Sequence, residues 1–144
     1  LGPKMLELSA TAADGAHPYW TTPEHTAMAR EAIGPGALLC VEQKVVFTTD
    51  ADAARAAGNQ QIDRYAALPN YRNNWIRLGF TDQEIEQRAH RFVDAVVVWG
   101  DEDRVRAGVQ AHYDAGADHV CVQPVNPDMS ADIDWNALEL LAPS

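Results

Sequence analysis

The spacing of apolar residues follows the period of an α-helix along most of the chain, and three short apolar runs interrupt it. Apolar positions three to four residues apart are typical of amphipathic helices, whereas short β-branched runs are typical of buried strands. The segments with helical spacing are 4–13, 23–33, 51–67, a short charged helix from 81, a stripe through 92–97, 101–115 and 133–141. The strand-like runs are 15–19, 43–47 and 118–124. The pattern therefore predicts helices and short strands in alternation.

Local signals mark where several of these helices begin. Thr21 and Glu24 have the spacing of a capping box, while Thr22 followed by Pro23 is another common helix start, so both remain open. The capping-box spacing recurs at residues 81–84. These signals favour independent helices separated by short turns.

Strands that alternate with helices predict right-handed crossovers and a parallel sheet, so the expected fold class is α/β. Three short strands are too few for a complete sheet, because a parallel sheet buries both faces and long unpaired edges are unfavourable. Residues 1–3 have the character of the end of a strand followed by a Gly-Pro turn. We therefore expect residues 1–144 to form a single incomplete domain, the C-terminal part of a larger barrel.

Composition and charge exclude several classes of function. The chain has 144 residues and a formal net charge of -10, which argues against binding to nucleic acid or to an anionic membrane surface. No apolar run approaches the roughly 20 residues that a membrane span needs, and the first residues do not form a signal peptide. Cys40 and Cys121 lie in apolar runs and are expected to be small buried side chains in a reducing cytoplasm.

Five stretches carry a resemblance to a known family: Leu1–Leu8, Ala13–Tyr19, Thr22–Thr26, Leu68–Asn74 and Asp114–Val120. They resemble the luciferase-like family, and more closely its actinobacterial deazaflavin (coenzyme F420)-dependent oxidoreductases. The resemblance implies a TIM (β/α)8 barrel with the cofactor at its C-terminal mouth. This chain would supply the end of strand five and strands six to eight. Because a whole barrel takes about 250 residues, the isolated chain is expected to be inactive.

The resemblance, together with local chemistry, gives candidate cofactor-binding residues. Gly2, Pro3 and Lys4 stand where the family's fifth strand turns into its helix, a loop used for the phosphate tail of the cofactor. A glycine and a free helix N-terminus suit an anion, and Lys4 can add a full positive charge. The alternative is an ordinary turn from strand to helix with a solvated lysine. Tyr19 and Trp20 fall at the end of the sixth strand, where their rings are expected to stack on the deazaflavin and exclude water.

His17 is the candidate catalytic residue at the end of the same strand. An imidazole titrates near neutral pH, so it can bind a substrate hydroxyl or carbonyl group, or transfer its proton. The alternative is that His17 and the neighbouring aromatic residues simply close the end of the sheet by packing.

Three further residues are candidates for substrate binding: Thr48, Arg72 and Gln123. Thr48 follows the seventh strand, although capping of the next helix explains its neighbours Thr49 and Asp50. Arg72 lies in an asparagine-rich segment and suits an anionic or carbonyl group, while a solvated loop is the alternative. Gln123 ends the eighth strand.

The expected function is that of an oxidoreductase that transfers a hydride between F420 and a small organic substrate. Two alternatives remain open: an FMN-dependent luciferase-like monooxygenase, and a non-catalytic half-barrel that associates with itself. The expected partners are a small-molecule substrate and either the missing N-terminal half of the barrel or a second copy. No metal site is expected, because His17 lacks a His-x-His partner and the two cysteines are far apart in the sequence.

Overall fold

The computed structural model describes residues 1–142 and contains eight helices and four strands within them. The helices are α1 (Pro3–Ala12), α2 (Pro23–Ile33), α3 (Ala51–Ile62), α4 (Pro69–Arg77), α5 (Asp82–Glu86), α6 (His90–Val96), α7 (Glu102–Asp114) and α8 (Trp135–Leu141). The strands are β1 (Gly15–Ala16), β2 (Leu38–Phe47), β3 (Val97–Gly100) and β4 (His119–Pro124). The expected α/β class with a parallel sheet is confirmed.

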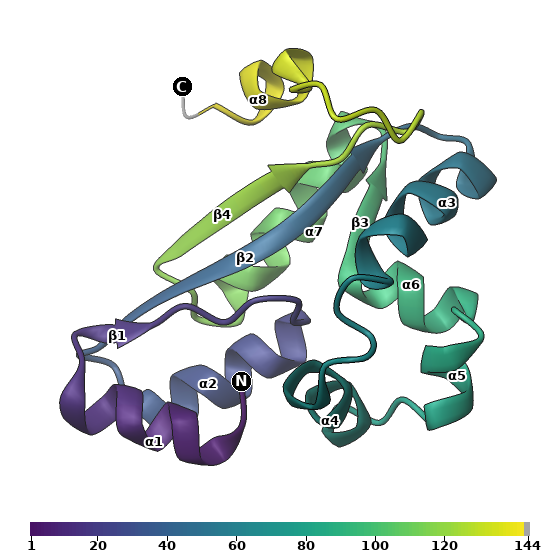
Figure 1. Ribbon diagram of the computed structural model, residues 1–144. Coiled ribbons are helices and arrows are strands. Elements are labelled where there is room, and N and C mark those ends of the chain that lie inside the picture. The colour runs from purple at the N-terminus through teal and green to yellow at the C-terminus, as the bar shows by residue number, and fades with distance from the viewer. Residues whose placement is uncertain (143–144) are drawn as a thin grey trace.

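The long strand β2 is the centre of the sheet, and the other three strands all pair with it in parallel (Figure 1). β3 and β4 both pair with Lys44 and Val45, so they lie on opposite edges of β2. β1 pairs with the beginning of β2. The backbone N–H groups of Leu38 and Glu42 donate to the segment that contains β1, whereas the Leu39 carbonyl, on the opposite edge of β2, accepts from the residue that precedes β4. β1 therefore lies on the same edge of β2 as β3. The described strands therefore form an open sheet, not a closed barrel.

The two faces of β2 are covered by different elements. Leu39 and Val41 belong to a core with residues of α1, α2 and β4. Val46, on the other face, belongs to a larger core rich in aromatic side chains from α4 and α6 and from residue 20. Because side chains alternate along a strand, the even-numbered residues of β2 point toward this aromatic core. Figure 1 shows α3 to α6 gathered on one side and α7 behind the sheet.

The strand β3 was not predicted from the sequence, and the reason lies in the residues at its start. Residues 92–97 have a helical apolar stripe, but α6 ends at Val96 and β3 begins at Val97 with no polar residue between them. The run Val96–Trp99 fits a helix and a buried strand equally well, so apolar spacing alone cannot divide it. The prediction of three strands was therefore wrong by one.

Other boundaries refine the sequence predictions. β1 is limited to two residues, although the Pro18 carbonyl still accepts a hydrogen bond from Glu42 N at 3.0 Å. Of the two proposed starts of α2, Thr22 is the N-cap and its hydroxyl accepts from His25 N. The capping box at residues 81–84 is present in full. Cys40 and Cys121 are free and only partly buried, so the expectation of buried cysteines was wrong.

Candidate functional site

A buried ion pair lies on the even-numbered face of β2. Glu42 and Lys44 are two residues apart, so both side chains project from the same face of the strand. Lys44 Nζ lies 2.9 Å from Glu42 Oε1, and the two residues are only 3% and 1% exposed respectively. Charged side chains are almost never this buried unless they are paired. The pair therefore marks a position where the fold tolerates a large desolvation cost.

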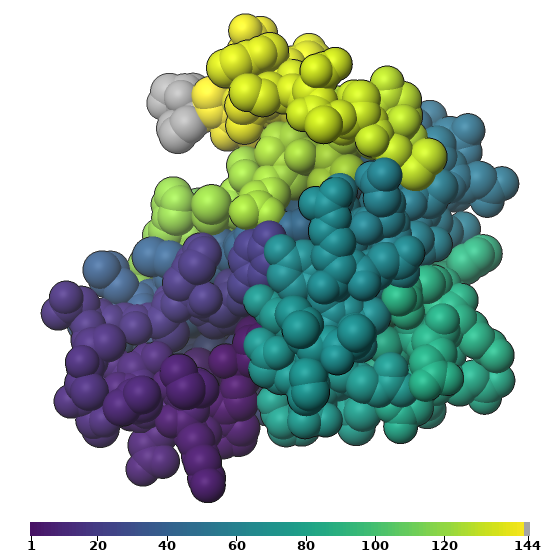
Figure 2. Space-filling model, in the orientation of Figure 1, coloured from purple at the N-terminus to yellow at the C-terminus, as the bar shows by residue number. Residues whose placement is uncertain are grey.

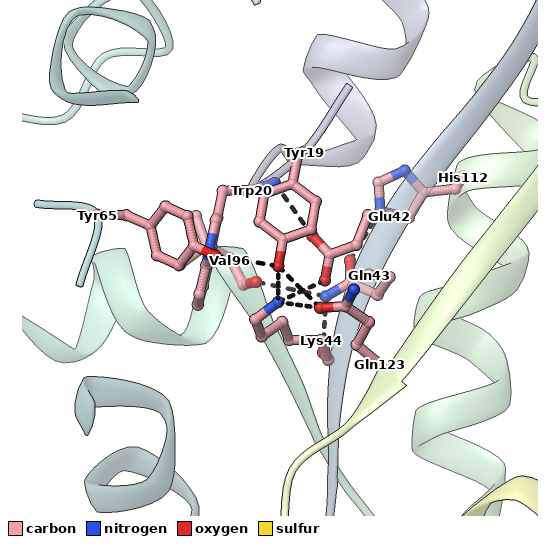
Figure 3. Close-up of polar contacts among 9 residues, drawn as sticks. All are labelled: Tyr19, Trp20, Glu42, Gln43, Lys44, Tyr65, Val96, His112 and Gln123. Atoms are coloured by element: carbon pink, nitrogen blue, oxygen red, sulfur yellow. Dashed lines mark hydrogen bonds and ion pairs between the residues drawn. The ribbon is translucent and has the colours of Figure 1, made fainter. Parts of the chain in front are cut away.

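Residues from three other segments complete the Lys44 cluster, which we define as Tyr19, Glu42, Lys44, Tyr65 and Gln123 (Figure 3). Gln123 on β4 is the register partner of Lys44, and its Oε1 accepts from Lys44 at 2.5 Å. Tyr19 OH accepts from Lys44 at 2.9 Å and donates to Gln123 Oε1 at 2.9 Å. Tyr65 OH donates to Tyr19 OH at 3.4 Å. All three ammonium donors of Lys44 are thereby used.

Aromatic rings enclose the charged end of Lys44. Its Nζ lies 4.5 Å from the centre of the Tyr19 ring and 4.6 Å from the centre of the Trp20 ring, which is within the range of a cation–π contact. Burial raises the pKa of the Tyr19 phenol, and the nearby Glu42 carboxylate raises it further, although hydrogen bonds from Tyr65 and to Gln123 oppose the shift. Tyr19 is therefore a neutral hydrogen-bonding group at physiological pH.

Trp20 is held in a strained backbone conformation beside this cluster. Its φ is 59°, a left-handed value that bulky residues rarely adopt. Two hydrogen bonds hold it there: Trp20 N donates to Glu42 Oε2 at 3.1 Å, and Trp75 Nε1 donates to the Trp20 carbonyl at 3.0 Å. Strain of this kind persists only where the surroundings fix it, and it concentrates at functional sites.

A polar hollow opens beside the Lys44 cluster. Its volume is about 430 Å³, which is within the range of small-molecule sites. Lys44 and Gln123 form part of its wall, and its other polar residues are Gln60, Gln61, Arg64, Asn126, Ser130 and Asp132. Lys44 and Gln123 belong to the C-terminal halves of adjacent parallel strands, the end at which α/β proteins bind ligands. The arrangement can hold a small polar molecule by hydrogen bonds.

The opposite face of β2 carries a second buried polar chain, which is neutral. His112 Nε2 donates to Gln43 Oε1 at 2.8 Å, and His112 Nδ1 accepts from the Thr26 hydroxyl at 2.8 Å. Burial lowers the pKa of His112 from 6.5 to about 4, against the opposing effect of the Glu24 carboxylate. The imidazole is therefore uncharged at neutral pH, and both of its nitrogens have partners.

The structure brings together Tyr19, Trp20 and Gln123 from the predicted set. Tyr19 and Gln123 are hydrogen-bonded to each other although 104 positions separate them in the sequence. Trp20 lies against Lys44 but is 1% exposed, so its indole packs into the aromatic core. His17 lies apart from the Lys44 cluster, and its Nδ1 donates to the Cys40 carbonyl at 2.7 Å.

The remaining predicted residues occupy other places. The Thr48 hydroxyl accepts from Asp50 N at 3.2 Å, beside the start of α3. Arg72 lies on a helix and not in the alternative solvated loop, and it is paired with Asp82 at 2.6 Å and with Glu86 at 2.8 Å.

Gly2 is the N-cap of α1, with Pro3 at the first helical position and Lys4 exposed at the second. A Cβ on Gly2 would lie 3.3 Å from Arg77 Nη2, so a larger residue would press on that guanidinium.

Glu42 and Lys44 were missed by the sequence reading, although a signal for them exists. The run Val41-Glu42-Gln43-Lys44-Val45 places two opposite charges at alternate positions, Glu42 just before the predicted strand 43–47 and Lys44 within it. Opposite charges two residues apart on a buried strand share one face and require partners there. That pattern points to an internal site more directly than the aromatic residues after β1 do.

Within residues 1–142, no group of three or more His, Cys, Asp or Glu side chains is arranged to hold a metal ion. No helix in the same part of the chain combines the length and the apolar character that crossing a membrane requires.

The fold of this chain is similar to that of solved F420-dependent enzymes. One is an F420-dependent secondary alcohol dehydrogenase in complex with an F420-acetone adduct, with 15% sequence identity and a TM-score of 0.60 over 89% of this chain. Another is the coenzyme F420-dependent tetrahydromethanopterin reductase from Methanopyrus kandleri, with 20% identity and a TM-score of 0.69 over 97% of this chain.

The predicted resemblance to F420-dependent oxidoreductases is thus confirmed at the level of the fold. This chain spans 42% of the dehydrogenase chain and 46% of the reductase chain, less than half of each. No protein-family model matches the sequence. No curated protein matches it by sequence either.

Proposed function

We propose that this chain supplies the C-terminal half of a TIM-barrel oxidoreductase that transfers a hydride between F420 and a small organic substrate. The observation that carries the proposal is the shared fold with two F420-dependent enzymes, over 89% and 97% of this chain. The position of the Lys44 cluster supports it independently, since enzymes of this architecture build their sites at the C-terminal ends of the strands.

The N-terminus of α1 fits the acidic tail of such a cofactor. Met5 N and Leu6 N both donate to the Gly2 carbonyl, and Pro3 has no N–H, which leaves Lys4 N unused in the first turn. A free N–H at a helix N-terminus favours an anion, and the exposed Lys4 side chain adds a full positive charge. Gly2, Pro3 and Lys4 would hold the tail here. When bound, F420 supplies a carbon that gives or takes a hydride.

The Lys44 cluster would bind and orient the substrate. Gln123 Oε1 accepts from both Lys44 and Tyr19, which directs the amide nitrogen of Gln123 away from them. A substrate carbonyl or hydroxyl oxygen in the adjoining hollow can accept from this nitrogen. The rings of Tyr19 and Trp20 shield the cluster from water. His17, outside the cluster, remains our candidate for proton transfer, with its Nδ1 held by the Cys40 carbonyl.

The open edge of the sheet supports the half-barrel part of the proposal. β4 pairs only with β2 among the described strands, so its other edge carries unpaired backbone groups. A hollow of about 1040 Å³ lies along this edge and includes Tyr113, Cys121 and Leu138. In a closed barrel the first strand would occupy this edge. The first half of the barrel is therefore our proposed neighbour, and a second copy of the chain is the alternative.

The test titrates the full-length protein with F420 and with FMN and follows cofactor fluorescence. We expect saturable binding of F420, weaker binding of FMN, and loss of substrate turnover but not of F420 binding in Lys44→Met. Tighter binding of FMN would favour the monooxygenase alternative. Binding of neither cofactor by a folded protein would overturn the proposal.

A further inference from the structure

The Gln123 side chain connects the Lys44 cluster to the polar hollow beside it. Gln123 is the register partner of Lys44, is half-buried, and forms part of the wall of the hollow. In Figure 2 the yellow-green segment after β4 meets the teal residues at the end of α3, and residues of both segments line the hollow. A primary amide carries an accepting oxygen and a donating nitrogen. Which of these two atoms is open to the hollow therefore decides whether Gln123 donates or accepts there.

The neighbours of Gln123 fix the orientation of its amide. The Lys44 ammonium has three donors and no acceptor, so only the amide oxygen can face it. Lys44 Nζ and Tyr19 OH both donate to Gln123 Oε1 (Figure 3). A reversed amide would place its NH₂ group against the ammonium, with no acceptor between them. A charge-assisted hydrogen bond thus holds the oxygen inside the cluster.

The amide nitrogen of Gln123 is left without a partner. Within residues 1–142, Nε2 makes no hydrogen bond, and it is not one of the fully buried polar atoms that lack a partner. It is therefore accessible to a small molecule, and the hollow is the opening that Gln123 borders. The amide thus offers donors, and not an acceptor, to a molecule that enters the hollow.

Glu42 keeps Lys44 in the state that fixes this amide. A neutral amine would offer a lone pair, and a reversed amide could then donate to it. Glu42 Oε1 lies 2.9 Å from Lys44 Nζ and supplies the counter-charge that a buried ammonium requires. Glu42 Oε2 accepts from Trp20 N at 3.1 Å, so the carboxylate is itself held in place.

We infer that the Glu42–Lys44 pair determines substrate specificity: it fixes the Gln123 amide as a donor, so the hollow takes a substrate whose reacting group is a hydrogen-bond acceptor, such as a carbonyl oxygen. The inference rests on the proposed function, which makes the hollow the substrate site. Glu42 and Lys44 act through Gln123 and are positioning residues. A group that only donates would meet the amide N–H groups with no acceptor available, and an unmet donor in a partly enclosed site weakens binding.

The test compares two neutral five-membered rings: cyclopentanone, which only accepts a hydrogen bond, and pyrrole, whose N–H only donates. Their dissociation constants are measured on the full-length protein from the shift of the Gln123 side-chain amide signal in ¹⁵N NMR, which Gln123→Met identifies by its loss. We expect cyclopentanone to bind about tenfold more tightly than pyrrole. In Lys44→Met/Glu42→Gln, the Tyr19 hydroxyl can either donate or accept, so both amide orientations are satisfied and the ratio should fall toward one.

His112→Gln is the matched control, because it alters the buried polar network on the other face of β2, which does not include Gln123. It should keep the parent ratio. A double variant that also keeps the parent ratio would mean that the charged pair is purely structural and would overturn the inference. Tighter binding of pyrrole than of cyclopentanone by the parent protein, or binding of neither ring, would overturn it too. F420 binding is titrated separately on the same proteins, so loss of F420 binding with an intact preference for cyclopentanone counts against the proposed function alone.

Discussion

The two faces of β2 bury polar side chains in opposite ways. On one face, Gln43 joins His112 and Thr26 in a chain that is neutral and fully hydrogen-bonded. On the other face, Glu42 and Lys44 are charged and nearly inaccessible to water. Adjacent residues of one strand therefore face a neutral network and an ion pair.

This difference is consistent with a structural role for the odd-numbered face and with the binding role that we propose for the even-numbered face. The neutral chain connects β2 to α2 and α7 through hydrogen bonds between side chains. The charged pair costs more to desolvate, adjoins the strained Trp20, and forms part of the wall of a polar hollow. Buried charges and strained backbone of this kind are expected mainly at functional sites. The comparison supports our proposal that the even-numbered face binds the substrate.

The largest expected loss of stability comes from removing one charge of the Glu42–Lys44 ion pair. Lys44→Met leaves Glu42 buried without a counter-charge, so we expect the free energy of unfolding to fall by about 3–5 kcal/mol. Urea unfolding followed by tryptophan fluorescence measures it.

The double variant Lys44→Met/Glu42→Gln is the control for this experiment. Because it removes both charges, it should recover much of the lost stability. A double variant whose loss equals the sum of the two single losses would mean that the two charges do not interact.

The neutral face should make the free energy of unfolding depend on pH. The unfolded chain binds a proton at His112 below about pH 6.5, whereas the folded chain resists protonation until the pKa of about 4. Stability from this group is therefore complete above pH 6.5 and is lost as the pH falls from 6.5 to 4, by about 3 kcal/mol in total. Unfolding free energies measured from pH 7.5 to 4 provide the test.

His112→Gln is the control for the pH series, since it keeps a donor and an acceptor but does not titrate. Carboxylates contribute acid sensitivity to both proteins, so the difference between the two curves isolates His112. Parallel curves across the whole range would show that this imidazole is not held neutral.

The sequence predicted most helices because their ends carry local signals. Thr22-Pro23 and the residues at 81–84 define helix starts without reference to the rest of the molecule. The end of α6 has no such signal, and β3 was missed for that reason.

The site was predicted only in part because its contacts are long-range. Tyr19 and Gln123 could be named as strand-end residues, since parallel strands end at one edge. Lys44 could not be paired with them from the sequence, because that requires knowing that β4 lies beside β2 in one register. The roles of His17, Thr48 and Arg72 stay predictions.

Removing the Tyr19 hydroxyl tests how much its hydrogen bonds contribute to the stability of the Lys44 cluster. Tyr19→Phe keeps the ring over Lys44 but deletes the oxygen that joins Lys44, Tyr65 and Gln123. We expect a loss of roughly 1–2 kcal/mol in unfolding free energy, smaller than for Lys44→Met because the ion pair survives. Tyr65→Phe is the control, since its 3.4 Å bond is long and its loss should be smaller. Equal losses in the two variants would contradict this ranking.

The smallest expected effect is at Arg72, whose ion pairs with Asp82 and Glu86 lie near the surface. Both carboxylates are largely exposed to water, which screens their attraction, so Arg72→Ala should cost less than about 1 kcal/mol in unfolding free energy. That cost should shrink further in 1 M salt, unlike the cost of Lys44→Met. Unfolding at low and high salt checks both statements. A variant with unchanged stability but a raised substrate KM in the full-length enzyme would instead show that Arg72 leaves these partners to bind substrate.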